Sequence, residues 1–228
     1  MKKQILGFLT IAIVFLLVAC DNSTPTPTPT PVDTTNTGAF KVFTIDGITT
    51  VQNLLADTIR GVGAMGPYGS GKVTFFNIST QKIVANSDSA TTKWDLGFRG
   101  TTIFTNSGTS GTGQGGAFIF NGLFDNLKTI SADSTFKVDT KTLLAIPTGS
   151  KKGWYAYDGA ANLITAIPGK VLVIRTADGK FAKMEILNYY KKGVTPAATA
   201  TDAAKTNGQR YYAYRFVYQP DGSKNFPK

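Results

Sequence analysis

The chain has 228 residues, with 24 Lys or Arg against 14 Asp or Glu, and its formal net charge is +10. It contains no histidine and no cysteine other than Cys20, which excludes histidine-based triads, intramolecular disulfides and His/Cys zinc sites. Glu185 is the only glutamate, so an enzyme would have to rely on aspartates, as a paired-Asp hydrolase does. We therefore expect a binding protein rather than an enzyme.

The first 19 residues have the form of a secretory signal. Lys2 and Lys3 precede an unbroken apolar run over residues 11–19, which matches a basic n-region and a short h-region. Ala19-Cys20 closes the run and is similar to a bacterial lipobox, in which the cysteine is lipidated and begins the mature chain. The alternative is an uncleaved membrane anchor, for which the run is short. Both interpretations export residues 21–228.

Residues 20–39 are predicted to be a tether. Proline occupies every second position from Pro25 to Pro31, which prevents both helix and sheet and favours extended chain. At about 3.1 Å per residue, the segment could hold a domain roughly 50 Å from its lipid. We thus divide the chain into a signal peptide (1–19), a lipidated cysteine with its tether (20–39) and one domain (40–228).

The mature chain is basic but has no basic cluster. Without Lys2 and Lys3 it keeps 22 basic and 14 acidic residues, a net charge of +8. No basic run is longer than two residues, as in Lys151-Lys152. A solvated basic surface explains this pattern better than a nucleic-acid site, so no nucleic acid is expected as a partner.

Most of the domain alternates apolar and polar residues with the period of a β-strand. Asp178-Gly179 lies between two such runs and is typical of a tight hairpin turn. The pattern predicts an all-β, antiparallel domain, with strands at Phe40–Ile45, Lys72–Ile78, Lys82–Val84, Trp94–Phe104, Ala117–Phe120, Lys170–Thr176, Phe181–Tyr190 and Arg210–Gln219.

One stretch has helical spacing instead. Apolar residues recur three and four positions apart from Val51 to Val62, with Thr49 as a candidate cap and Gly61 as a stop. The pattern indicates one short helix. A loop with two short strands is the alternative, because Asn53 and the glycine-rich exit weaken the helical pattern.

Two glycine motifs suggest phosphate binding but lack the required setting. Gly111 to Gly116 satisfies G-x-G-x-x-G, and Gly66 to Lys72 satisfies G-x-x-x-x-G-K, with Val73 in place of the magnesium-binding hydroxyl. Both run into strand patterns, whereas a phosphate site needs a following helix. We interpret both as turns, and Gly108–Gly116 as the reversal between two neighbouring strands.

Several segments, in order, resemble a known family. They are Lys93–Arg99, Thr105–Gly108, Gly111–Ala117, Gly153-Trp154-Tyr155, Val171–Lys183 and the aromatic last strand. Together they are similar to the HmuY family of haem-binding lipoproteins over roughly residues 40–220. The resemblance implies a twisted antiparallel β-fold with a ligand cleft between projecting hairpins. It also implies haem iron held by two axial histidines or methionines.

The axial ligands of the family have no match here. The first ligand-bearing arm corresponds to Ala132–Pro147, which contains no histidine, methionine or cysteine. The second corresponds to Gly153–Gly159, where Tyr157 or Asp158 occupies the ligand position. Of the methionines, Met184 is expected in the core, and Met65 in its loop remains a candidate ligand.

Tyrosine could replace the missing ligands. A tyrosinate binds ferric haem if a basic neighbour lowers its pKa, and Lys151 and Lys152 are close in sequence to Tyr155 and Tyr157. Strand alternation places Tyr155 and Tyr157 on one face and Trp154 on the other. This pair could also form a stacking surface for a flat ligand, or simply a packed hairpin.

The leading hypothesis is a lipid-anchored protein of a Gram-negative cell envelope, at the outer membrane, that captures haem or another planar ligand for uptake. An outer-membrane uptake receptor is the expected partner, and no cofactor is required. The alternative is an adhesion or assembly module on the same scaffold without haem. An aspartate hydrolase comes third, because Asp95 is better explained as a structural carboxylate near Arg99.

Overall fold

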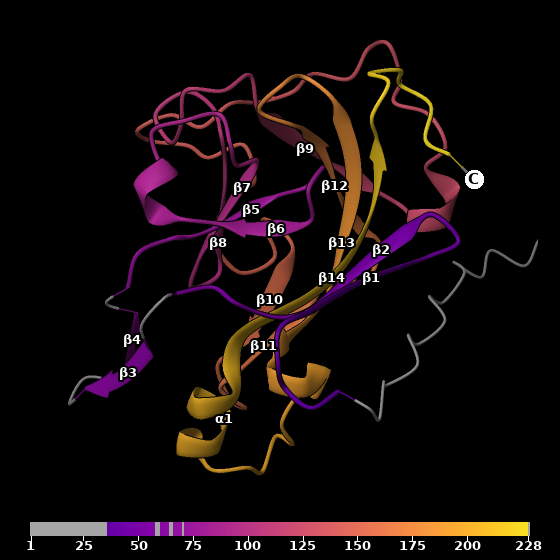
Figure 1. Cartoon of the computed structure of the whole chain (residues 1–228). Helices are drawn as coiled ribbons and strands as arrows, with labels where there is room; N and C mark the ends of the chain where they lie inside the picture. The colour runs from indigo at the N-terminus through magenta and orange to yellow at the C-terminus, as the bar shows by residue number, and fades with distance from the viewer. Residues whose placement is uncertain (1–35, 58–59, 64–65, 70, 228) are drawn as a thin grey trace, which may run out of the picture.

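The computed structural model describes residues 36–57, 60–63, 66–69 and 71–227. The predicted signal peptide, Cys20, most of the tether and the candidate Met65 lie outside this part of the chain. Within it, two antiparallel sheets form the body of the molecule, and two hairpins extend from it (Figure 1). The predicted all-β, antiparallel fold is confirmed. No helix in the described ranges is long and apolar enough to cross a membrane.

The larger sheet has six strands, and most of them coincide with the predicted ones. Its hairpin between β12 and β13 turns at Gly179, which has a positive φ of 84°, as the Asp-Gly signal predicts. Adjacent strands are antiparallel in the order β1 (Lys41–Ile45), β2 (Ile48–Leu55), β14 (Gln209–Gln219), β13 (Phe181–Tyr190), β12 (Lys170–Arg175) and β9 (Gly116–Asn121).

A four-stranded sheet covers one face of the larger sheet. The main core lies between them, where the ring of Phe98 stacks on Tyr214 at 5.6 Å and Phe76 meets Phe216 edge-on. Such aromatic pairs bury large apolar areas. The smaller sheet runs in the order β6 (Lys82–Val84), β5 (Thr74–Asn77), β7 (Leu96–Arg99) and β8 (Thr102–Thr105).

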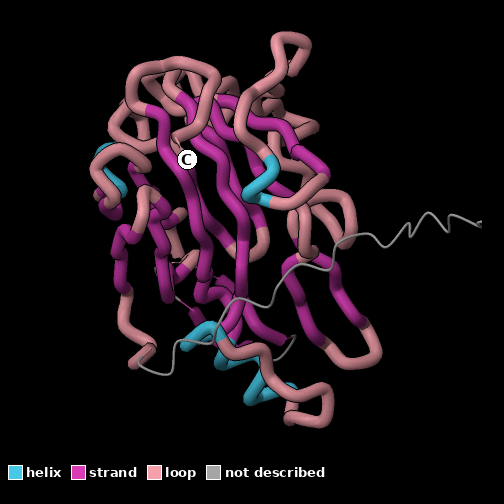
Figure 2. The backbone as a smooth tube through the Cα atoms, turned by 90° about the vertical axis from the view of Figure 1, so that its right-hand side faces the viewer, coloured by secondary structure: helices cyan, strands magenta, loops and turns pink. Residues whose placement is uncertain are grey.

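The opposite face of the larger sheet has a partial cover. Phe124, Leu127 and Phe226 pack there against Val173 and Val217 in a second apolar cluster. The cover comes from the segment after β9, which includes one turn of 3-10 helix at Phe124–Asn126, and from the C-terminal residues, which form a loop (Figure 2). The larger sheet is thus buried on both faces at one end only.

The remaining elements are short. The two hairpins pair β3 (Arg60–Gly63) with β4 (Gly66–Gly69) and β10 (Tyr155–Asp158) with β11 (Leu163–Ala166). Single turns of 3-10 helix occur at η1 (Asn86–Asp88), η2 (Phe124–Asn126) and η3 (Lys191–Gly193), and an α-helix, α1, covers Asp202–Gly208.

The helix predicted between Val51 and Val62 is wrong. Val51 to Leu55 belong to β2, paired with β1 and β14, and Val62 belongs to β3. The apolar spacing arises because Asn53 has a positive φ of 57°, which shifts the strand's alternation by one residue. The α-helix of the described chain lies instead at α1, where the Thr201 side chain caps the Ala204 backbone N–H.

Two other predictions also need correction. The single long strand at Trp94–Phe104 is a hairpin of β7 and β8 that turns at Gly100, with a φ of 55°. The loop at Gly108–Gly116 does not join neighbouring strands, because β8 lies in the smaller sheet and β9 in the larger one. It passes from one layer of the molecule to the other. The strand β9 follows directly, so the loop opens no helix.

Candidate functional site

The β10–β11 hairpin contains the candidate residues Tyr155, Tyr157 and Asp158. Tyr155 pairs with Ala166 and Tyr157 with Ile164. Four residues join the strands, and the last of them, Asn162, has a positive φ of 51°, a conformation that asparagine tolerates. The Asp158 carboxylate accepts the backbone N–H groups of two loop residues, at 2.9 and 3.2 Å. This aspartate therefore stabilises the turn of its own hairpin.

The base of the hairpin is part of the protein core. Trp154 is buried, and its indole Nε1 donates to the carbonyl of Thr101 at 3.0 Å. Tyr155 is also buried, its ring lies 5.0 Å from that of Trp154, and its hydroxyl accepts from Thr101 at 3.4 Å. Tyr155 thus holds the hairpin against the body of the protein and leaves little surface for a ligand.

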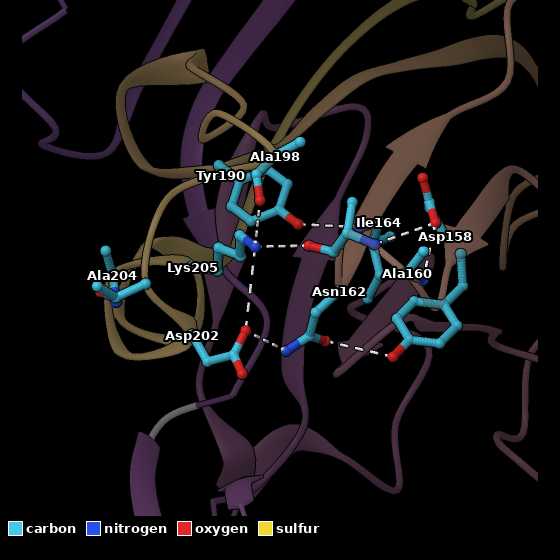
Figure 3. Close-up of polar contacts among 12 residues, drawn as sticks. Asp158, Ala160, Asn162, Ile164, Tyr190, Ala198, Asp202, Ala204 and Lys205 are labelled. Carbon is cyan, nitrogen blue, oxygen red and sulfur yellow. Dashed lines mark hydrogen bonds and ion pairs between the residues drawn. The ribbon is translucent and has the colours of Figure 1, made fainter.

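Tyr157 lies further along the hairpin and is 48% exposed. Its hydroxyl donates to the Asn162 side-chain oxygen at 3.3 Å, while the Asn162 amide nitrogen donates to Asp202 at 3.0 Å (Figure 3). A carboxylate requires a donor, so Asp202 orients the amide with its oxygen towards Tyr157. The Tyr157 hydroxyl must then donate the hydrogen bond to Asn162, and a tyrosine that donates is a neutral phenol.

Helix α1 supports the tip of the hairpin from one side. Lys205 is buried, and its ammonium donates to the carbonyls of Ala161 at 2.6 Å and Ala198 at 2.8 Å (Figure 3). The Tyr190 hydroxyl accepts the Ile164 N–H at 2.9 Å. These contacts connect the loop of the hairpin to α1 and its second strand, β11, to β13. Tyr157 therefore lies on a hairpin that is anchored to neighbouring segments of the protein.

The two lysines near these tyrosines in sequence do not contact their hydroxyls. Lys151 donates its backbone N–H to the carbonyl of Tyr155 at 2.8 Å, and the side chains of Lys151 and Lys152 are exposed. Residues 150–166 are all described, and none of their ion pairs or hydrogen bonds joins an ammonium to Tyr155 or Tyr157. The geometry provides no cation to stabilise a tyrosinate there.

The segment Ala132–Pro147, which corresponds to the first arm, is held by a buried aspartate. The Asp139 carboxylate accepts the Thr105 backbone N–H at 3.0 Å and the Ala145 N–H at 2.8 Å. Between these anchors, Leu143 is 74% exposed. This arm thus exposes apolar side chains, and residues 132–147 contain no His, Met or Cys.

The other candidates are distributed as follows. Met184 is fully buried in the main core, as predicted. Burial raises the pKa values of the core tyrosines Tyr189, Tyr190, Tyr212 and Tyr214 above their usual range, so these side chains remain neutral phenols. No cluster of three or more His, Cys, Asp or Glu suited to a metal ion occurs among the described residues.

Asp95 has a structural role, but its predicted neighbour is wrong. Its carboxylate accepts the backbone N–H groups of Ile78 and Ala177, both at 2.8 Å. Arg99 instead lies over the ring of Phe104 at 5.4 Å. The two hydrogen bonds of Asp95 thus join a segment of the smaller sheet to one of the larger sheet.

Sequence reasoning did not identify Asn162, Asp202 and Lys205. The Thr201-Asp202-Ala-Ala run was a readable signal, because threonine is a common helix cap and an acidic residue favours the first turn. Nothing in the sequence indicated that Lys205 would reach a loop 44 residues away.

Three solved structures are similar to this chain at low sequence identity. A protein of Bacteroides fragilis assigned as a lipoprotein is 15% identical, with a TM-score of 0.46, and the match covers 77% of this chain and 94% of that one. A protein of Bacteroides vulgatus assigned as HmuY-like and haem-binding is 17% identical (TM-score 0.46; 76% and 92% covered). The apo HmuY analogue of Tannerella forsythia is 13% identical (TM-score 0.42; 80% and 97%).

No curated protein matches the sequence. The sequence model of the family described as "HmuY protein" does match, over residues 70–201. This range includes the smaller sheet, the glycine loop and the β10–β11 hairpin, and it is more than half of the chain. The protein is therefore a member of the HmuY family.

Proposed function

We propose that this protein is a lipid-anchored binding protein of the cell envelope that captures haem, or a related planar ligand, and does not transform it. The observation that carries the proposal is the HmuY family match over residues 70–201. Residues 1–19 and Cys20 support export and lipidation. An outer membrane location and transfer to an uptake receptor in that membrane complete the proposal.

Tyr157 is the proposed ligand contact. Its ring is half exposed at a braced hairpin, and its hydroxyl donates to Asn162. A neutral phenol in this geometry suits stacking on a planar ligand. To bind ferric iron, the phenol would have to lose its proton and leave Asn162, since iron binds the tyrosinate. Experiment can distinguish these two roles.

The test is a hemin titration of residues 21–228, the exported chain. We expect a saturable shift of the Soret band together with quenching of tryptophan fluorescence. If Tyr157 stacks, Tyr157→Phe keeps the spectrum and Tyr157→Ala weakens binding roughly tenfold, the loss of about 1–1.5 kcal/mol expected for an aromatic contact. If it binds iron, Tyr157→Phe changes the ferric spectrum itself.

The matched control is Tyr211, a tyrosine on β14 whose ring lies under Lys191, and Tyr211→Ala should leave hemin binding unchanged. Absence of any Soret shift in the wild-type protein would remove haem from the proposal.

The second candidate function is an adhesion or assembly module. It would be supported by binding of a glycan or envelope protein without haem. The lack of His, Met and Cys in residues 132–147 and 153–159 favours that candidate.

A further inference from the structure

A groove of about 1020 Å³ lies on the face of the larger sheet that points away from the smaller one. Its floor is four strands wide, from β1 through β2 and β14 to β13. Pockets for small organic ligands usually measure roughly 300–1,000 Å³. The groove is thus large enough for such a ligand, and its lining does not include Tyr157.

Arg215 marks the border between this groove and the covered end of the same face. Its guanidinium lies 4.4 Å from the ring of Phe124, which belongs to the cover, and pairs with Glu185 at 2.8 Å. Glu185 balances the charge of Arg215. The arginine therefore closes one side of the groove without adding net charge to it.

The strand register arranges the floor in rows. Lys41 faces Gln52, Phe43 faces Thr50 and Ile45 faces Ile48, and all of these residues line the groove. Residues two apart on a strand share a face. From Lys41 to Ile45 the floor therefore changes from polar to apolar, over about 14 Å at 3.4 Å per residue.

The polar end has two lysine residues. Lys41 lies at this end with its Nζ 5.1 Å from the ring of Phe43. Lys192 lines the same end, because its backbone N–H donates to Asn53, next to Gln52, at 2.7 Å. No carboxylate is within ion-pair distance of either lysine in the described part of the chain. The acidic residue of the lining, Asp46, lies beyond the apolar end.

We infer that this groove binds a single-chain organic anion, with the anionic head at Lys41 and Lys192 and the apolar chain along Phe43, Ile45 and Ile48. The charge pattern fixes the direction of the ligand, because its head is attracted to the ammonium groups and repelled by Asp46. The apolar floor supplies most of the affinity, since exposed ion pairs contribute little. This site is separate from the proposed haem contact.

The test uses oleate as the probe and calorimetry on residues 21–228, which contain every element of the fold. We expect one saturable site. Exchanging both lysines, Lys41→Glu with Lys192→Glu, should weaken it at least about tenfold through charge reversal. The control Lys82→Glu changes an exposed lysine of the smaller sheet and should have no effect. Hemin binding should not change in any of these variants.

A second variant tests the apolar end without risk to the fold. Ile45 is 64% exposed, so Ile45→Asp should fold normally and still weaken oleate binding. The inference is overturned if oleate shows no saturable binding, if both variants bind it as the wild type does, or if oleyl alcohol binds as tightly as oleate. It is also overturned if sedimentation shows a dimer that Ile45→Asp dissociates and oleate does not, since a second copy would then occupy the groove.

Discussion

At the scale of single residues, Asp95 connects three segments of the chain. It precedes β7, and its carboxylate accepts from Ile78 after β5 and from Ala177 after β12. Two backbone donors with no other acceptor depend on this side chain. It is buried, with 3% of its surface exposed, so water cannot replace it.

We expect Asp95→Asn to lower the free energy of unfolding by about 2–3 kcal/mol. An amide can accept only one of the two N–H groups and turns its own donor towards the other, which leaves a buried donor unsatisfied. Urea denaturation measures the effect. The control is Asp88→Asn, an exposed ion pair with Lys93, which should change stability by less than about 1 kcal/mol.

The same variant should also change the pH dependence of stability. Burial raises the pKa of Asp95 above its usual 3.8, against the lowering effect of the hydrogen bonds from Ala177 and Ile78. Between the unfolded and folded pKa values, the folded state binds more protons than the unfolded state. This group therefore removes stability as the pH rises from about 4 to its folded pKa. The loss should be absent from Asp95→Asn, and identical slopes in both proteins would contradict the assignment.

Residue roles were predictable where the immediate sequence determines them. The burial of Met184 and the structural use of Asp95 follow from the strand pattern. The partner of Asp95 could not be predicted from the strand pattern, because Ala177 lies 82 residues away and only the packing of the two sheets brings the two residues together. Likewise, alternation places Tyr155 and Tyr157 on one face, but the ring of Trp154 and the Thr101 hydroxyl bury the first and not the second.

At the scale of elements, the sequence predicts strands well and irregular points poorly. The period-two pattern predicts β12, β13 and β14, together with the hairpin turn between β12 and β13. The errors occur where one residue adopts a positive φ inside a predicted element, as Asn53 and Gly100 do. Such a residue changes which face its neighbours occupy, so a periodicity that assumes regular backbone gives the wrong element.

Helix α1 and the β10–β11 hairpin should behave as one unit. Replacing Lys205 by methionine keeps most of the side-chain volume but removes the donor to the carbonyls of Ala161 and Ala198. We expect faster amide hydrogen exchange across residues 159–164 in Lys205→Met, because the loop loses its anchor. If Tyr157 contacts haem, the affinity for hemin should fall as well.

The control for this variant is Lys152→Met, which removes an exposed ammonium beside the same hairpin. It should leave both the exchange rates and hemin binding as they are in the wild type. Unchanged exchange at residues 159–164 in Lys205→Met would mean that the remaining contacts, such as the Tyr190 hydroxyl with Ile164 and Asn162 with Asp202, hold the hairpin without Lys205.

At the scale of the whole molecule, the glycine loop joins the two sheets around one buried side chain. Asn106 follows β8 and is fully buried, and its amide donates to the carbonyls of Trp94 and Thr91 and accepts from Gly113. The loop wraps closely around this residue before entering β9. The glycines indicate that the backbone approaches another group closely, but the sequence does not show that the loop folds back onto Asn106, which lies just before it in the chain.

Gly115→Ala should therefore destabilise the molecule by about 1–3 kcal/mol, the usual effect of overpacking. An added Cβ would lie 2.6 Å from the carbonyl oxygen of Asn106, which also accepts the Gly115 N–H. The backbone connection between the two sheets would have to move. Gly159→Ala is the matched control, since its Cβ would meet Tyr157 at an ordinary 3.7 Å. Thermal unfolding measures the Tm of each variant. An equal decrease in Tm for both variants would show that the loss of the glycine itself, and not the contact with Asn106, causes the destabilisation.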